Sequence, residues 1–164
     1  MFVPPSWQLR PIRIEDNAEL AGVLRTVLME MKVPKTGTAF ADPELDAMYQ
    51  SYDKEGANYW VIESDGLLYG GAGIANLQRG PATVCELQKM YFLPKARGLG
   101  LGAAMMQKCL ETALSYGYKQ CYIETMPNMK AAQHCYKKFG FMYIDAPMGN
   151  TGHHACPVWM LKNL

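Results

Sequence analysis

The sequence has almost no excess of charge of either sign. Its 164 residues include 16 basic and 15 acidic side chains, which gives a formal net charge of +1. A protein whose main partner is nucleic acid usually carries a strong basic excess on one face. The charge balance therefore argues against a nucleic-acid-binding function.

Long apolar segments are also missing. No stretch reaches the roughly 18 apolar residues that a membrane-spanning helix needs. The first residues, M-F-V-P-P-S-W, lack the basic start and the apolar run of a signal peptide. We therefore expect a cytoplasmic protein that has no membrane partner. Hydrophobic residues still make up 49% of the sequence, which predicts one globular domain over residues 1–164.

The five cysteines lack the spacing of a metal site. They are odd in number and include no C-x-x-C pair. The adjacent His153 and His154 are weaker evidence still for zinc, so we predict no metal. Four cysteines fall in apolar helix or strand patterns, which predicts small buried side chains in a reducing compartment. These four are Cys85, Cys109, Cys121 and Cys135.

Hydrophobic periodicity predicts a mixed α/β (α+β) fold. The dipeptide Asp65-Gly66 is a strong hairpin signal between two strands, and one strand–helix–strand unit implies a parallel crossover in the middle. We expect a mostly antiparallel sheet of six to seven strands with helices on both faces. The predicted strands cover residues 7–14, 59–64, 67–77, 83–93, 120–125, 141–144 and 157–161, and the predicted helices cover about 16–33, 42–52, 100–116 and 128–139.

Two of these predictions depend on single residues. In the first strand, Ile14 is expected to face inward together with Trp7 and Leu9. The second helix is expected to open at Asp42-Pro43, because proline is favoured in the first helical turn.

The most informative segment runs from Glu86 to Gly102 and reads E-L-Q-K-M-Y-F-L-P-K-A-R-G-L-G-L-G. A strand leads into a loop with three glycines, and the loop becomes a helix. Glycines let successive backbone N–H groups turn toward one point, and the helix N-terminus adds unpaired donors and a positive dipole end. The segment is therefore a candidate phosphate site, to which Lys95 and Arg97 add charge. Taken alone, the glycines could equally make a tight turn and nothing more.

Two common phosphate-binding motifs do not fit this loop. Its glycine spacing is G-x-G-x-G, whereas the dinucleotide fingerprint requires G-x-G-x-x-G. The P-loop pattern G-x-x-x-x-G-K-[ST] is absent too. The loop does match R-x-x-G-x-G, through Arg97, Gly100 and Gly102.

This motif and its surroundings resemble the GNAT acyltransferases. In that family R-x-x-G-x-G is the pyrophosphate signature, and E-L-Q-K-M-Y-F-L-P is similar to the fourth strand. The segment Y-I-E-T-M-P-N-M-K-A-A-Q-H-C-Y-K-K-F-G-F is similar to the fifth strand and the helix after it. The clear match covers about residues 83–145. It implies an N-acetyltransferase that uses acetyl-CoA as cosubstrate and whose two central strands are splayed apart.

The resemblance also implies where the cofactor lies. The pantetheine arm would lie between the splayed strands and bond to the main chain of Met90, Tyr91 and Phe92. An N–H near Met90 or Tyr91 would polarise the thioester carbonyl. Asn128 would hold the arm, although an asparagine after Pro127 is also a good helix N-cap. The pyrophosphate would contact the loop residues Arg97, Gly98, Leu99, Gly100, Leu101 and Gly102.

The implied reaction is direct attack of an amine on the thioester. An amine with a pKa of about 10.4 must lose a proton near neutral pH, which costs roughly 4–5 kcal/mol and calls for a base or a water chain. Glu86 is the candidate base, with Glu124 as the second, although Glu86 could instead be a solvated or ion-paired residue. Tyr136 would protonate the departing thiolate, unless it is a core aromatic of its helix.

The acceptor is the least specified partner. We expect the primary amine of a small molecule, because no acidic or basic docking surface stands out. His153 and His154 precede the last strand, where the family often lines its acceptor pocket, but either could be an exposed loop residue. Cys156 could form an acyl-enzyme with a histidine, although a structural role is expected. The alternative to an enzyme is a non-catalytic acyl-CoA-binding sensor or scaffold. The resemblance further implies a homodimer.

Overall fold

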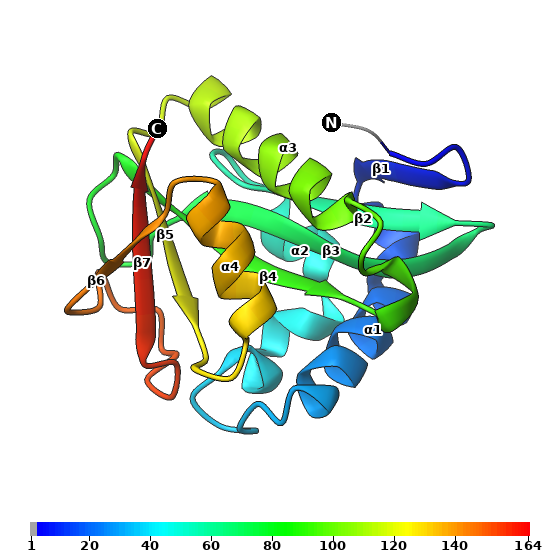
Figure 1. The fold of residues 1–164 in the computed structure, drawn as a ribbon, viewed down its shortest axis with the longest axis horizontal. Coiled ribbons are helices and arrows are strands. Elements are labelled where there is room, and N and C mark those ends of the chain that lie inside the picture. The colour runs from blue at the N-terminus through cyan, green and yellow to red at the C-terminus, as the bar shows by residue number, and fades with distance from the viewer. Residues whose placement is uncertain (1–2) are drawn as a thin grey trace.

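The computed structural model describes residues 3–164, which form a mixed seven-stranded sheet (Figure 1). The strands are β1 (Trp7–Pro11), β2 (Asn58–Ser64), β3 (Leu67–Asn76), β4 (Val84–Phe92), β5 (Gln120–Thr125), β6 (Met142–Ile144) and β7 (Val158–Asn163). Their order in the sheet is β1-β2-β3-β4-β5-β7-β6. Only β4 and β5 pair in parallel among the described strands. The predicted sheet and its parallel crossover are confirmed.

Four α-helices in the described part of the chain cover the two faces of the sheet: α1 (Asn17–Glu30), α2 (Met48–Tyr52), α3 (Leu101–Ser115) and α4 (Lys130–Lys138) (Figure 1). On one face, α1 and α2 form a core with β2 that includes Leu24, Met48 and Tyr59. On the other face, α3 and α4 pack around Met105 and Tyr136. Each helix pair therefore buries its apolar side against a separate face.

The two long helices bury the apolar stripes that their sequences predict. Residues three or four positions apart lie on the same side of a helix, so such spacing creates a continuous apolar side. In α1 the buried stripe consists of Leu20, Val23, Leu24, Val27 and Leu28, and in α3 it includes Met106, Cys109, Leu110 and Ala113. These predictions are confirmed.

The parallel strands β4 and β5 separate soon after they begin. They pair only through Val84–Gln120, Cys85–Cys121 and Glu86–Tyr122. Beyond Glu86, β4 continues to Phe92 with β3 on one side and no paired residue of β5 on the other. The predicted splay of the two central strands is confirmed, and it leaves main-chain groups of β4 free to bind another chain-like group.

Three predicted element boundaries are wrong. The first strand ends at Pro11, and a 3₁₀ turn follows that leaves Ile14 exposed. The predicted helix 42–52 is divided into a 3₁₀ segment (Pro43–Asp46) and α2, because Ala47 between them has φ −139° and ψ 47°, outside the helical region. The helix predicted from Asn128 begins at Lys130, and the Asn128 side chain instead donates to the carbonyl of Met31, just after α1.

The predicted burial of the cysteines is correct with one exception. Cys85, Cys109 and Cys121 are buried free thiols, and Cys156 is buried as well. Cys135 is partly exposed, because the side of α4 on which it lies borders a cleft.

Within residues 3–164, no helix combines the length and the apolar character needed to cross a bilayer.

Candidate active site

The loop between β4 and α3 presents a series of free backbone donors. The amide of Arg97 is used within the loop, where it donates to the carbonyl of Pro94 at 3.0 Å. The following amides, from Gly98 to Ala103, donate to no acceptor in the described residues. Gly98 and Gly100 have φ values of +73° and +79°, which other residues rarely adopt. These glycines therefore fold the chain so that consecutive N–H groups remain available at the N-terminus of a long helix, the usual setting for a bound phosphate.

The basic side chains beside this loop are arranged differently from the prediction. The guanidinium of Arg97 forms a two-point ion pair with Glu30, the last residue of α1, at 2.7 and 2.8 Å. Its Nε atom donates to the carbonyl of Phe92 at 2.9 Å. Lys95 turns away and contacts the hydroxyl of Tyr69 at 3.1 Å. The positive charge expected at the loop is thus neutralised or directed elsewhere, and the free amides are the principal groups of the loop that remain available to an anion.

A cleft of about 350 Å³ follows the gap between the splayed strands. The predicted residues that line it are Met90, Tyr91, Phe92, Arg97, Gly98, Gly102 and Asn128. Leu99, Gly100 and Leu101 belong to the same loop but do not line the cleft. The structure therefore brings the strand, loop and helix residues of the three sequence motifs together around one elongated space.

The opposite wall of this cleft contains residues that sequence reasoning missed. Val27 and Met31, in and just after α1, line it together with Lys130 at the start of α4. The Nδ2 atom of Asn128 donates to the carbonyl of Met31 at 2.8 Å, which joins the β5–α4 loop to the end of α1. Val27 reads as an ordinary core position in the sequence, and no local motif indicates that α1 borders a cleft.

A bulge shapes the middle of β4 beside the cleft. Gly71 lies opposite Tyr91 and Gly73 lies opposite Gln88, so β4 has one more residue than β3 between these pairs. Lys89 adopts a φ of +49° at this point, and the hydroxyl of the buried Tyr59 donates to its carbonyl at 2.8 Å. Bulges bend a strand and redirect its side chains, and this one marks where β4 leaves β5.

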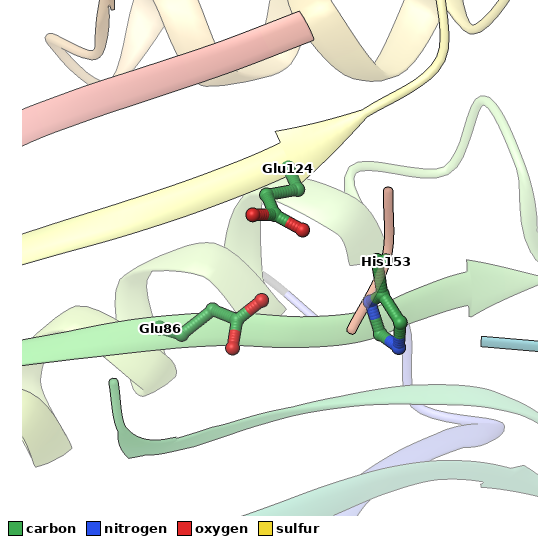
Figure 2. Close-up of side chains that lie close together, drawn as sticks. All are labelled: Glu86, Glu124 and His153. Atoms are coloured by element: carbon green, nitrogen blue, oxygen red, sulfur yellow. The ribbon is translucent and has the colours of Figure 1, made fainter. Parts of the chain in front are cut away.

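Glu86, Glu124 and His153 come together where the strands part (Figure 2). One donor atom from each residue lies within 4.8 Å of the other two. Glu86 belongs to β4, Glu124 to β5, and His153 to the loop before β7. Figure 2 shows the two carboxylates facing each other, with the imidazole beside them. The two candidate bases and one of the candidate substrate-contacting histidines thus form one cluster.

Glu86 is the most buried member, with 4% of its surface exposed. The amide of Gln88 donates to its Oε2 atom at 2.7 Å, and Tyr52 holds Gln88 in turn at 2.6 Å. Burial is the main cause that raises the pKa of Glu86, and the nearby charge of Glu124 adds to it. The Gln88 hydrogen bond lowers this pKa in part, and the net value is about 7. A carboxyl group with such a pKa can accept a proton at neutral pH.

Glu124 is held by neutral donors. The hydroxyl of Tyr122 donates to its Oε1 atom at 2.8 Å, and the hydroxyl of Thr151 donates to Oε2 at 2.6 Å. Both donors are neutral and supply no counter-charge. Glu124 thus lies beside Glu86 with no cationic hydrogen-bond partner of its own, and its charge helps to raise the pKa of Glu86.

His153 belongs to a second, charge-balanced group. Its Nε2 atom lies 2.9 Å from Asp42, and Asp42 also pairs with the Lys89 ammonium at 3.3 Å. Lys89 is almost completely buried and forms its other ion pair with Glu44. Burial lowers the pKa of His153, but the hydrogen bond and charge of Asp42 outweigh it, so this pKa is raised overall. Asp42 and Lys89 were not identified from the sequence, because their partners are far apart in the chain.

Glu86, Glu124 and His153 also offer a set of donors that could hold a metal ion. Their 4.8 Å spread is wider than the separation of about 3.4 Å between ligands of a tetrahedral zinc site with bonds near 2.1 Å. An ion would therefore need the side chains to move closer together.

Tyr136 and Cys156 are placed less favourably for catalysis. Tyr136 is buried among core residues, its ring centroid lies 6.1 Å from that of Phe141, and it does not line the cleft. Burial raises its pKa above the usual tyrosine value. Burial and the charges of Glu124 and Glu86 raise the pKa of Cys156 to about 12. A thiol with that pKa is almost fully protonated at neutral pH, which disfavours the acyl-enzyme interpretation.

Two further cavities continue from the end of the cleft. Tyr91 and Met129 line both the cleft and a small cavity of about 30 Å³, which reaches Glu86. Glu124, His153 and Cys156 then border both this small cavity and an open one of about 320 Å³ on its far side. His154 is exposed and lines the open cavity. The cleft and the open cavity thus approach the carboxylate cluster from two sides.

Known proteins resemble this arrangement over nearly the whole chain. The acetyltransferase (GNAT) family model matches residues 14–141. The uncharacterized N-acetyltransferase YjgM of Escherichia coli K12 is 43% identical over 164 residues, which cover 99% of this chain and 98% of that protein.

Solved structures share the fold at low sequence identity. A GNAT-family acetyltransferase of Staphylococcus aureus Mu50 has a TM-score of 0.85 at 19% identity, covering 96% of this chain and 99% of that one. A phosphinothricin acetyltransferase of the same superfamily from Sinorhizobium meliloti, solved in complex with AcCoA, has a TM-score of 0.74 at 20% identity, covering 97% and 89%.

Proposed function

The chain belongs to the acetyltransferase (GNAT) family and is an N-acetyltransferase, and we propose that it transfers the acetyl group of acetyl-CoA directly to a primary amine of a small molecule. The family uses acyl-CoA donors. The acetyl donor, the small-molecule acceptor and the residue roles below are our assignments. We also propose that residues 1–164 act as a single domain.

The cofactor lies in the cleft between β4 and β5. Its diphosphate contacts the free amides from Gly98 to Ala103 at the start of α3, where the helix dipole favours an anion. The pantetheine arm pairs with the unpaired side of β4 at Met90, Tyr91 and Phe92. Asn128 borders the arm from the other side.

The acetyl group lies at the inner end of the cleft, beside the bulge of β4. A backbone N–H near Met90 or Tyr91 donates to the thioester carbonyl and stabilises the negative charge that forms on its oxygen. Tyr91 lines both the cleft and the small cavity that reaches the carboxylate cluster, and this position supports the assignment.

Glu86 is the general base. The amine nitrogen attacks the thioester carbon, and its proton passes to the Glu86 carboxylate directly or through one water in the small cavity. A base is most effective when its pKa lies near the working pH, and burial gives Glu86 a pKa of about 7. Glu124, which lies beside it, is the second candidate for this role.

Tyr136 is the proposed acid that protonates the sulfur. When the tetrahedral intermediate collapses, the carbon–sulfur bond breaks and the thiolate of coenzyme A takes a proton to give an amide and free coenzyme A. Burial raises the pKa of Tyr136, so this transfer requires that the departing thiolate is equally poorly hydrated. Tyr136 is thus the assignment with the least support from the geometry.

One observation carries the proposal as a whole. A cleft with free amides at one end reaches, at its other end, a buried carboxyl group with a pKa near neutrality. Such an arrangement suits a cosubstrate with a diphosphate at one end and a reactive group at the other.

The experiment is a measurement of thiol release from acetyl-CoA with a panel of small amines. We expect turnover with at least one amine, and we expect Tyr136→Phe to lower it by roughly tenfold or more. The matched control is Tyr116→Phe, which removes the hydroxyl of an exposed tyrosine beyond the end of α3. Unchanged turnover in Tyr136→Phe with intact folding would remove Tyr136 as the acid.

A further inference from the structure

The side chains that line the open cavity beyond Glu86 indicate which chemical groups an acceptor could present there. It is bordered by Glu124 and His153 from the carboxylate cluster, by Trp159 from β7, and by His154. It lies opposite the cofactor cleft, so an amine that enters through it would reach the thioester across Glu86 and Glu124. Its lining residues therefore act on the part of the acceptor next to the reacting nitrogen.

The basic side chains around this route are already neutralised or exposed. Lys89 is enclosed by Asp42 and Glu44, and His153 bonds to the same Asp42. The remaining basic residue of the two cavities is His154, which is exposed to solvent. No arginine lines either cavity within residues 3–164.

The two glutamates, in contrast, accept hydrogen bonds only from neutral side chains among the described residues, although His153 lies within 4.8 Å of both. Neither Glu86 nor Glu124 forms an ion pair in the described part of the chain. Glu86 is more than nine-tenths buried, and the only donor to it is the amide of Gln88, so its Oε1 atom accepts no hydrogen bond from described residues. Figure 2 shows this carboxylate aimed at Glu124 and His153. The group therefore lacks a positively charged donor that an ammonium ion would supply.

We propose that the acceptor is a cationic amine with no carboxylate next to its reacting nitrogen. This inference rests on the proposed acetyl transfer and names the class of its acceptor. The ammonium group binds between Glu86 and Glu124 before it is deprotonated. An α-amino acid would bring its own carboxylate close to these two, and like charges at such short distances repel strongly in a poorly hydrated site.

The test compares acceptors that differ only in this carboxylate. Agmatine, arginine and arginine methyl ester form one set, and tyramine, tyrosine and tyrosine methyl ester form another. Each kcat/KM is corrected for the fraction of protonated amine, which is the form proposed to bind, and EDTA is present so that no metal ion occupies the carboxylate cluster. We expect the decarboxylated amines to exceed the amino acids by roughly tenfold or more. The esters, which keep the bulk but lose the charge, should recover most of the difference.

Two variants test whether the acceptor preference depends on the charge in this cavity and not on the net charge of the protein. Glu124→Gln should narrow the ratio of agmatine to arginine to about threefold or less, because one of the two repelling charges is gone. Glu111→Gln changes the net charge equally at an exposed glutamate of α3 and should leave the ratio as it is.

Failure of the acceptor inference and failure of the proposed acetyl transfer give different results. If the amino acids react as well as or better than the decarboxylated amines, the inference is overturned while acetyl transfer stands. If the esters remain as poor as the amino acids, size and not charge excludes them, which also overturns it. If no amine in either set releases thiol, the proposed acetyl transfer to small amines fails and the inference fails with it.

Discussion

Glu86 illustrates how the environment of a residue determines its chemistry. Glu86 occupies the last paired position of two parting strands, and its side chain is buried where the paired part of these strands ends. Burial next to Glu124 gives its carboxyl group a pKa of about 7, whereas a solvated glutamate has a pKa near 4.3. This residue can thus hold or release a proton within the physiological range of pH.

The pH dependence of the reaction should report this group. We expect kcat/KM for the amine to rise through a limb near pH 7 as Glu86 loses its proton. Glu86→Gln should lose that limb and lower kcat by about 100-fold or more, within the usual range for a general base. Steady-state kinetics between pH 5.5 and 9 check this prediction. A limb that persists in Glu86→Gln would assign it to another group.

Glu86→Gln should also change how the stability of the protein depends on pH. Between the ordinary glutamate pKa of 4.5 and the folded-state value of about 7, the folded protein holds a proton that the unfolded chain has lost. The contribution of Glu86 to the free energy of unfolding therefore falls as pH rises through this window. Thermal unfolding should find Glu86→Gln more stable than the wild type at pH 8, with a smaller difference at pH 5. A variant that is less stable at pH 8 would contradict the stated cause of the pKa shift.

At the scale of elements, the proposed cofactor binding depends on the junction between β4 and α3. The loop must turn so that six consecutive amides, from Gly98 to Ala103, stay free of internal acceptors. Gly98 makes this possible with a φ of +73° and also lines the cleft. Because the N-terminal turn of α3 continues directly from these residues, the helix dipole and the free donors act on the same point.

A pair of glycine substitutions at the two ends of this junction and helix tests that role. Gly98 and Gly117, which follows α3, both have positive φ values and open space where a Cβ atom would lie. Alanine at either position should cost about 1–2 kcal/mol of stability through backbone strain. Only Gly98→Ala should raise the Kd for acetyl-CoA, by about tenfold, because only it disturbs the loop amides. Calorimetric titration of both variants checks this, and equal weakening would point to a general loss of stability.

Elements whose signals are local could be predicted from the sequence. The Asp65-Gly66 hairpin forms with positive φ at both residues, and the apolar stripes of α1 and α3 are buried. Boundaries failed where a polar side chain has a distant partner. Asp42 bonds to His153, 111 positions away, and Asn128 bonds to Met31, 97 positions away. Aspartate and asparagine are both common at helix N-caps. A sequence pattern cannot reveal that these two side chains form tertiary contacts instead.

The candidate site follows the same rule. The motif around Arg97 predicted the residues of the loop and of β4 that line the cleft. The ion pair between Arg97 and Glu30, and the enclosure of Lys89 by Asp42 and Glu44, depend on helices and loops that the fold brings together. Pairings of this kind arise from tertiary structure, so no spacing in the chain reports them.

At the scale of the whole molecule, the two proposed binding regions meet where the central strands part. The cleft proposed for the cofactor and the open cavity proposed for the acceptor are joined by the small cavity that Glu86 and Glu124 line. The helices on each face have their own core, so the strands can part in the middle while both layers remain packed. The homodimer that the family resemblance implies stays a prediction.

The most direct test of this account is residue-resolved amide hydrogen exchange by NMR, with and without acetyl-CoA. In the ligand-free protein the amides from Gly98 to Ala103 have no internal acceptor and should exchange rapidly. Saturating acetyl-CoA should slow several of them by about tenfold or more, because they become donors to the diphosphate. If calorimetry shows that acetyl-CoA binds while these amides keep their ligand-free rates, the cofactor lies elsewhere and the account is contradicted.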